Sequence, residues 1–223
     1  MLDDGVPVEL DIRLEGSRIA LRAPRAVDVA ELRALVSRNA DHLRPWSPSP
    51  PPGVNPLGFA ELGRTIAKQR RDWKLGSAYV FVAAMRYGRE PIVGRVALTS
   101  VVRGAWQSAQ LGYWLDAASG GRGLMTECVG VVLEFAFEGL GLHRVQAAVM
   151  PRNQPSRRIL IKRGFREEGY AERYLKIGGK WEDHIIYGLT AEEWRPGLRE
   201  AAGDVAVLRE ATNDRQLLTG SSR

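Results

Sequence analysis

The chain has 223 residues, of which 44% are hydrophobic and 26% are charged, and its formal net charge is +6 at pH 7. These values are typical of a globular protein with one sizeable core, and no apolar run reaches the roughly 20 residues that a membrane-spanning helix needs. The positive charge favours anionic partners such as a phosphorylated cofactor or a ribonucleoprotein surface, but no basic run with interleaved aromatic residues predicts direct nucleic-acid binding.

Cysteine and histidine usage excludes further classes of protein. The single cysteine, Cys128, allows no internal disulfide and lies in an apolar helical run, so we expect it to be a buried packing thiol. The histidines His42, His143 and His184 have no metal-ligand spacing, and we expect no metal site. The acidic start of the chain is followed by no apolar stretch, which predicts no secretory signal and a cytoplasmic protein.

The first third of the chain contains one predicted strand and two predicted helices. Residues 1–16 carry few helix or strand signals, and we expect them to form a lead-in. Alternating polar and apolar residues predict a strand at 18–22, and Asp28 can cap the helix that follows. A second helical pattern covers residues 59–73. The stretch 42–56 between the helices is rich in proline, which excludes a regular helix or a central strand there.

The rest of the chain alternates between strands and helices. The predicted elements are strands at 78–86, 91–102 and 108–115, a buried helix ending near residue 137, a strand at 144–149, a helix between Asn153 and Gly164, and a hairpin of strands at 166–177 and 180–189. The strand–helix–strand–helix centre requires parallel pairing, whereas the hairpins are antiparallel. We therefore predict one α/β domain at 17–195, with a mixed, mostly antiparallel central sheet flanked by helices, and a flexible tail at 196–223.

A glycine-rich stretch at 120–126 lies between a predicted strand and a predicted helix. The first N–H groups of a helix have no internal acceptor, and they point outward at the positive end of the helix dipole. Glycines let a ligand approach the backbone closely, and Arg122 adds a positive charge. The stretch therefore predicts a phosphate or pyrophosphate site, with an ordinary strand-to-helix loop as the alternative.

Six short segments carry a resemblance to a known family through their order and spacing. They are residues 111–115, 121–127, 141–145, 153–156, 163–169 and 179–184. Together they resemble the GNAT acetyltransferase superfamily, and in particular its ribosomal-protein-alanine N-acetyltransferase (RimJ/RimL-type) branch, over about residues 18–194. The resemblance implies the GNAT fold, acetyl-CoA as cosubstrate, and no metal. It also implies that strand 112–115 diverges from strand 145–149 and that the pantetheine arm lies in the gap.

The resemblance also implies roles for single residues. The superfamily's acetyl-CoA loop has the pattern Arg/Gln-x-x-Gly-x-Gly/Ala, in which Gly123 matches the central position, whereas Gly120 and Met125 depart from the pattern. Since pyrophosphate binding in this family rests chiefly on backbone N–H groups, we expect the site to be retained. The cofactor-binding residues implied are Trp114, Leu115, Gly121, Arg122, Gly123, Leu124, Met125, Thr126, Asn153 and Ser156.

For the chemistry, the resemblance places Ser156 near the CoA sulphur, where it would protonate the leaving thiolate. Helix capping by Asn153 and Ser156 is the alternative explanation for both residue types. Some RimL-type relatives carry a glutamate base at the position of Leu175. The remaining candidates for the base are Glu172, Asp183, His184 or a water chain, and the Asp183–His184 pair can instead anchor the last hairpin. Trp46 and Tyr113 are expected to wall the acceptor cleft.

Three functions follow as hypotheses. The first is acetylation of the N-terminal α-amine of a protein, in particular a ribosomal protein. The second is acetylation of a small amine such as a polyamine or an aminoglycoside, which would favour a narrow acidic pocket. The third is a binding module that holds acetyl-CoA without efficient turnover. In each case we expect a monomer or a homodimer that has no membrane partner.

Overall fold

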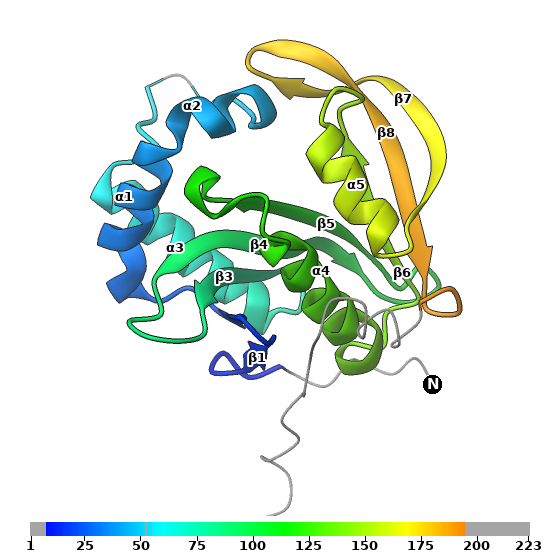
Figure 1. Ribbon diagram of the computed structural model, residues 1–223, viewed down its shortest axis with the longest axis horizontal. Helices are drawn as coiled ribbons and strands as arrows, with labels where there is room; N and C mark the ends of the chain where they lie inside the picture. The colour runs from blue at the N-terminus through cyan, green and yellow to red at the C-terminus, as the bar shows by residue number, and fades with distance from the viewer. Residues whose placement is uncertain (1–7, 52, 195–223) are drawn as a thin grey trace, which may run out of the picture.

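The computed structural model describes residues 8–51 and 53–194 of the chain. Its centre is a sheet of eight strands in the order β1-β2-β3-β4-β5-β6-β8-β7 (Figure 1). All neighbouring strands are antiparallel except β5 and β6, so the predicted mixed, mostly antiparallel sheet is confirmed. The strands are β1 (Arg13–Glu15), β2 (Ile19–Arg22), β3 (Tyr79–Met85), β4 (Ile92–Val102), β5 (Ser108–Leu115), β6 (Arg144–Val149), β7 (Arg166–Ile177) and β8 (Lys180–Thr190).

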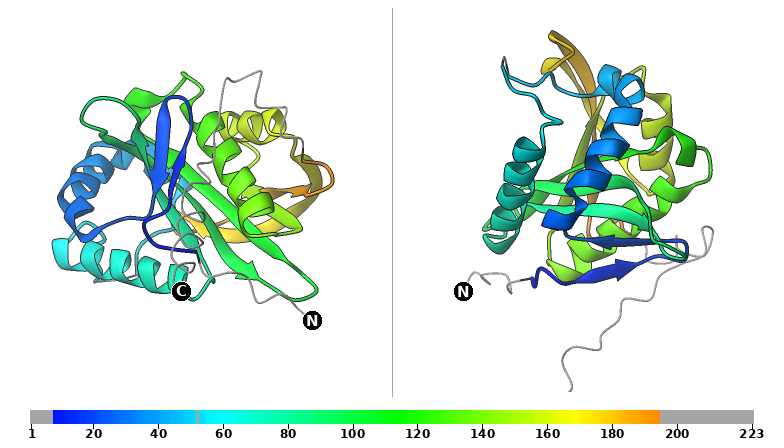
Figure 2. Two further views of the ribbon diagram at one scale, coloured as in Figure 1. Left: turned by 90° about the horizontal axis from the view of Figure 1, so that it is seen from below. Right: turned by 90° about the vertical axis from the view of Figure 1, so that its left-hand side faces the viewer.

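Helices cover both faces of the sheet, with α1 and α3 on one face and α4 and α5 on the other (Figure 2). The α-helices are α1 (Val29–Arg38), α2 (Ala40–Leu43), α3 (Phe59–Lys74), α4 (Leu124–Glu134) and α5 (Gln154–Lys162). Shorter helical turns are η1 (Ala26–Asp28), η2 (Arg44–Trp46), η3 (Ala117–Ser119) and the π-helical η4 (Phe135–Gly139). Among the described residues, no helix has both the length and the apolar character that crossing a membrane requires.

The structure corrects the prediction for the start of the chain. Within the expected lead-in, residues Arg13–Glu15 form β1, which pairs with β2. Three residues are too few to show an alternating pattern, and the strand is held instead by contacts distant in sequence. One example is the ion pair of 2.8 Å between Arg13 Nη2 and Glu90 Oε1. The predicted tail at 196–223 lies outside the described residues.

The proline-rich stretch also differs from the prediction at its beginning. Residues 42–56 were expected to be irregular throughout, but α2 ends at Leu43 and η2 follows it directly. Pro45 lies in the first turn of η2, where a helix needs no backbone N–H donor. The two short helices carry the chain outward from the end of α1 (Figure 1).

The core lies between the sheet and α4. Helix α4 is buried on almost every side, as its apolar sequence predicted, because it packs between the sheet and α5. Cys128 on α4 is fully buried, and burial raises the pKa of its thiol, which confirms a packing role. Trp73, at the end of α3, belongs to the same core: its ring packs edge to face with Tyr79 and Phe81, with centroid distances of 5.2 and 4.8 Å, and all three rings contact Phe135 after α4.

The parallel pair β5–β6 opens the site. The two strands are paired only where residues 108–110 lie beside residues 144–146. Beyond that point β5 continues its pairing with β4, and β6 continues with β8. The sheet therefore splits between residues 111–115 and residues 147–149, which is the divergence that the family resemblance implied.

Candidate functional site

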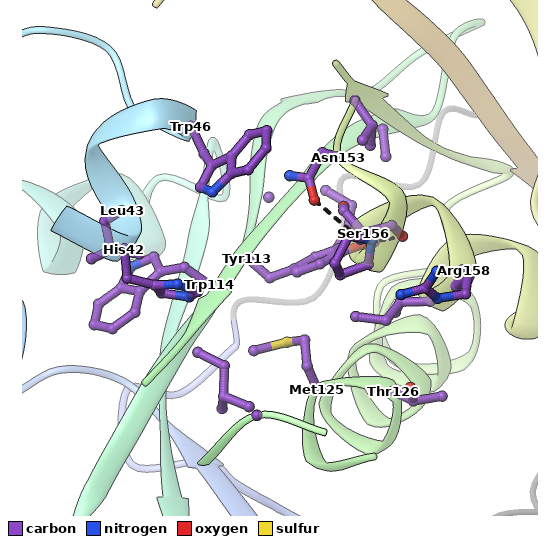
Figure 3. Close-up of a pocket in the computed structure, with 18 of the residues that line it drawn as sticks. His42, Leu43, Trp46, Tyr113, Trp114, Met125, Thr126, Asn153, Ser156 and Arg158 are labelled. Atoms are coloured by element: carbon purple, nitrogen blue, oxygen red, sulfur yellow. Dashed lines mark hydrogen bonds between the residues drawn. The ribbon is translucent and has the colours of Figure 1, made fainter. Parts of the chain in front are cut away.

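A cavity of about 1040 Å³ lies where the two strands separate (Figure 3). Its lining comes from five regions: β5, the glycine loop with the start of α4, the end of β6 with α5, the α2–η2 segment, and β8. Of the residues expected to bind cofactor or substrate, those that line it are Trp46, Tyr113, Trp114, Leu115, Gly121, Gly123, Leu124, Met125, Thr126, Asn153 and Ser156. The fold thus brings together side chains from distant parts of the sequence.

The glycine loop forms one end of this cavity. Gly121 and Gly123 have φ angles of 73° and 76°, in the left-handed region that favours glycine. Gly123 is the N-cap of α4, and the first helical hydrogen bond joins the Glu127 N–H to the Gly123 carbonyl at 3.1 Å. The three N–H groups between them have no acceptor inside the helix. This geometry suits an anion, as predicted for the loop.

The buried carboxylate of Glu127 is connected to the glycine loop through Arg18. Glu127 is 1% exposed and accepts hydrogen bonds from the backbone N–H and the Nε of Arg18, each at 2.8 Å. The same arginine donates from Nη1 to the carbonyl oxygen of Arg122 at 2.9 Å. Strand β2 is therefore connected through one arginine to both the helix start and the loop. No local sequence pattern relates Arg18 to Glu127, so this support could not be predicted from the sequence.

Two cations line the cavity on α5. Arg158 and Lys162 are four positions apart, so they lie one helical turn apart on the same face. Their position on the same cavity as the glycine loop suits a ligand with several negative charges. Arg122 was predicted for this role, but its side chain is not part of the lining, and its Nη2 donates to the Ala118 carbonyl at 3.4 Å. Two basic residues four positions apart, just after the Asn-x-x-Ser segment, could have indicated from the sequence that Arg158 and Lys162 share one face of a helix beside the cofactor site.

Asn153 and Ser156 occupy the start of α5, and the structure separates their roles. The Asn153 side chain accepts a hydrogen bond from the Ser156 N–H at 3.3 Å, which confirms Asn153 as the N-cap (Figure 3). The Ser156 hydroxyl instead lies 2.9 Å from the Tyr113 hydroxyl. Tyr113 also contacts the Ser156 carbonyl at 3.1 Å, and burial raises the pKa of its phenol. The serine hydroxyl therefore has a buried, protonated partner and does not cap the helix.

The predicted pair Asp183 and His184 points in two directions. Asp183 accepts hydrogen bonds from the Tyr170 hydroxyl at 2.7 Å and from the Arg173 N–H at 2.8 Å, so it joins β8 to β7. These two donors lower the pKa of the Asp183 carboxyl, and the residue does not line the cavity. His184 does line it and is 3% exposed.

The protonation of His184 follows from its neighbour. Its Nδ1 lies 3.0 Å from the carbonyl oxygen of Glu182. Because a carbonyl oxygen can only accept, Nδ1 carries the proton in this contact, and Nε2 of the neutral ring keeps its lone pair. In this tautomer Nε2 is the ring nitrogen that can accept a hydrogen bond.

The α2–η2 segment forms the opposite end of the cavity from the glycine loop. His42, Leu43 and Trp46 line this end, and Figure 3 shows the Trp46 ring near Asn153, with His42 and Leu43 farther from α5. The acceptor-side role expected for Trp46 and Tyr113 stays a prediction, and both residues line the cavity.

The charges of the lining are unequal in sign. Among its described residues the lining has one carboxylate, Asp116, and it is held by Arg38 Nη2 at 2.9 Å and by Asn39 Nδ2 at 2.8 Å. The hydrogen bond from Arg38 is the main cause of the lowered pKa of Asp116. In all residues that the structure describes, and not only in the lining, the His, Cys, Asp and Glu side chains form no group of three or more that could hold a metal ion.

Comparison with known proteins agrees with this architecture. Residues 18–166 match the family described as the Acetyltransferase (GNAT) domain. The probable N-acetyltransferase YjcK of Bacillus subtilis is 49% identical over 189 residues, which cover 79% of this chain and 96% of that protein. The ribosomal protein uS5-alanine N-acetyltransferase of Escherichia coli is 32% identical over 188 residues, covering 83% of this chain and 94% of that protein.

A solved structure shows the same fold with a coenzyme. RimJ of Mycobacterium smegmatis in complex with CoA-disulfide superimposes with a TM-score of 0.80 at 30% identity, covering 86% of this chain and 95% of that one. The family match covers more than half of the chain, and the relatives are covered almost completely. This chain therefore belongs to the GNAT family and is an N-acetyltransferase.

Proposed function

We propose that this enzyme transfers an acetyl group from acetyl-CoA to the N-terminal α-amine of a protein, in particular a ribosomal protein. Three observations support the proposal: the anion-binding loop, the proton-handling groups along the cavity, and the charge of the lining. The Escherichia coli relative that is 32% identical is named as an enzyme that acetylates an alanine of a ribosomal protein.

The residues present fit acetyl-CoA as the donor. The free N–H groups at the start of α4 suit its pyrophosphate, and Gly121 and Gly123 leave space for close approach of the phosphate oxygens. Arg158 and Lys162 supply positive charge along α5 beside that loop. The unpaired edge of β5 at residues 111–115 faces the gap in the sheet, where backbone groups can bind the amides of the pantetheine arm.

Acetyl-CoA supplies the acetyl group as a thioester, and the protein's part is to move protons and orient the amine. An α-amine has an ordinary pKa of about 7.7–8.0, well below the roughly 10.4 of a lysine, so it loses its proton readily near neutral pH. His184 Nε2 accepts that proton, directly or through water. Ser156 Oγ, held in place by the Tyr113 hydroxyl, donates a proton to the leaving thiolate and regains one through solvent as His184 gives up the amine's proton, so that both side chains return to their starting states.

The charge of the cavity lining favours an acceptor with one amine over a polycationic amine. A polyamine or an aminoglycoside bears several positive charges, and its recognition would need unpaired carboxylates in the cavity. The one carboxylate among the described lining residues, Asp116, is already bonded to Arg38 and Asn39. An acceptor with a single amine, such as a protein N-terminus, fits this distribution.

The release of free thiol from acetyl-CoA tests the proposal. The panel contains alanine- and serine-starting peptides, the same peptides with a blocked N-terminus and an internal lysine, spermidine, and an aminoglycoside. We expect release with the free N-termini and little release with the blocked peptides. Faster turnover of spermidine or the aminoglycoside, or of the blocked peptides, would overturn the proposed acceptor.

A further inference from the structure

The acceptor end of the cavity is bordered by two walls that are far apart in the sequence. One wall is the α2–η2 segment, which contributes His42, Leu43 and Trp46. The other is the first half of β8, which contributes His184. Figure 1 shows α2 and the β7–β8 hairpin as separate projections on the same side of the molecule. The distance between these two projections therefore depends on contacts that connect them.

Arg152, in the turn between β6 and α5, touches both walls. Its Nη1 and Nη2 donate to Glu182 on β8 at 2.6 and 3.1 Å, one to each carboxylate oxygen. This forked geometry is specific to arginine, because a lysine ammonium presents no pair of parallel donors. The guanidinium carbon of Arg152 also lies 5.7 Å from the centre of the Trp46 ring, within the range of a cation–π contact. We call Trp46, Arg152 and Glu182 the Arg152 bridge.

The α2–η2 segment has a second attachment at its other end. Asn39, which is 2% exposed, donates to Asp116 Oδ1 at 2.8 Å and accepts from the Ala117 N–H at 2.9 Å. That attachment is buried and joins the segment to the end of β5. The Trp46–Arg152 contact is more exposed, since the Arg152 side chain is 51% accessible. One end of the segment is therefore firmly fixed, and the end at the acceptor mouth is held by a weaker, salt-sensitive contact.

We propose that the Arg152 bridge sets the width of the acceptor mouth and thereby positions the acceptor chain, so that Arg152 and Glu182 determine affinity for the acceptor and not for acetyl-CoA. The inference rests on the proposed function, in which the acceptor enters at this end of the cavity. The glycine loop, Arg158 and Lys162 line the cavity whereas Arg152 and Glu182 do not, so loss of the bridge should leave the donor contacts unchanged.

The bridge also neutralises the negative charge of Glu182. The forked bonds from Arg152 occupy both oxygens of this carboxylate, so its charge is neutralised at the mouth. Without Arg152, an uncompensated carboxylate would lie two residues from His184, at the border of the cavity. Removal of the arginine therefore changes both the geometry and the charge preference of the mouth, and polycationic amines become better acceptors.

The test compares acceptor KM, acetyl-CoA KM and kcat for wild type, Arg152→Lys and Glu182→Gln, using the amine that the wild-type panel identifies as the best acceptor. The wild-type acceptor panel by itself tests the proposed function. The comparison of variants tests the bridge, so the two proposals can fail independently. We expect each variant to raise the acceptor KM about 3- to 10-fold, with acetyl-CoA KM and kcat close to wild type, from the ordinary strength of exposed ion pairs and cation–π contacts.

Rescue and control variants complete the experiment. The charge exchange Arg152→Glu with Glu182→Arg should recover only the part of the acceptor affinity that the ion pair carries, because a glutamate at 152 makes no cation–π contact with Trp46. Trp46→Phe should be milder than Trp46→Ala because it keeps a ring. Glu193→Gln breaks a comparable ion pair, Arg166 Nε to Glu193 Oε1 at 2.6 Å, and should leave the acceptor KM unchanged. An unchanged acceptor KM in Arg152→Lys and Glu182→Gln, an equal rise in acetyl-CoA KM, or the same rise in Glu193→Gln would overturn the proposal.

Discussion

The hydroxyl groups of Tyr113 and Ser156 lie 2.9 Å apart, although one is on β5 and the other is in the first turn of α5. The contact spans the gap where the parallel strands separate. Burial keeps the tyrosine protonated by raising its pKa, so it serves as a lasting partner for the serine hydroxyl. The serine is thus oriented by a residue that belongs to the opposite side of the cavity.

The first prediction concerns this pair. Ser156→Ala should lower kcat by roughly 10²-fold, because the leaving thiolate loses a positioned acid, while acetyl-CoA affinity changes little. Tyr113→Phe should lower kcat by a smaller factor, roughly 2- to 10-fold, because it removes one hydrogen bond. The double variant should be no slower than Ser156→Ala if the tyrosine acts through the serine. An unchanged kcat in Ser156→Ala, measured together with Tm, would remove the serine from the mechanism.

The second prediction concerns the glycine loop. Gly123→Val should abolish acetyl-CoA binding, because a β-branched side chain at φ of 76° strains the loop and blocks the approach of phosphate. Wild type at 100 times the dissociation constant should gain about 2.7 kcal/mol of stability, seen as a rise in Tm. Gly104→Val is the matched control, since its φ is also positive, at 67°, and it lies in the turn between β4 and β5. Retention of the Tm shift in Gly123→Val, or its loss in Gly104→Val, would contradict the assignment.

The third prediction concerns the support below that loop. Glu127→Gln should destabilise the fold by about 1.5–3 kcal/mol, because the buried carboxylate loses charged hydrogen bonds from Arg18. It should also weaken acetyl-CoA binding, since the Arg18 contact with the Arg122 carbonyl depends on it. Glu61→Gln, which removes the exposed ion pair with Arg64, is the control and should shift neither quantity measurably. Equal acetyl-CoA affinity in Glu127→Gln and wild type would show that the loop needs no such support.

The fourth prediction concerns stability at acid pH. Asp28 is 4% exposed and accepts bonds from Arg22 at 2.7 and 2.9 Å and from the Arg25 N–H at 2.7 Å. Burial opposes ionisation of this carboxyl, but the bonds from Arg22 and Arg25 outweigh it and lower its pKa. A lowered folded pKa contributes stability that is present above the unfolded value of about 3.9 and is lost as pH falls through the folded pKa.

Asp28→Asn should therefore lower Tm at pH 7, by an amount equivalent to about 1–3 kcal/mol. The difference from wild type should shrink as the pH falls from about 5 towards 2, because protonation removes the same charge from the wild-type protein. A constant difference in Tm across that pH range would mean that the charge of Asp28 contributes nothing to stability.

The sequence by itself determined the elements whose signals are local. Alternation predicted β2 and β6, the cap and the glycine predicted the two ends of α5, and the all-apolar helix predicted the burial of α4. The same holds for the glycine loop, because its chemistry depends on backbone conformation and on one helix start. The strand β1 was not predicted, because three residues are too few to show a pattern with a period of two.

Only the tertiary structure decided which side chains meet. Ser156 appeared from the sequence to be a capping residue or an acid, and the buried hydroxyl of Tyr113 separates these roles. Arg152 and Glu182 carried no signal at all, because the contact that joins them to Trp46 depends on how three distant segments come together. Such contacts are set by the divergence of β5 from β6, and that divergence is a property of the whole sheet and not of any stretch of the chain.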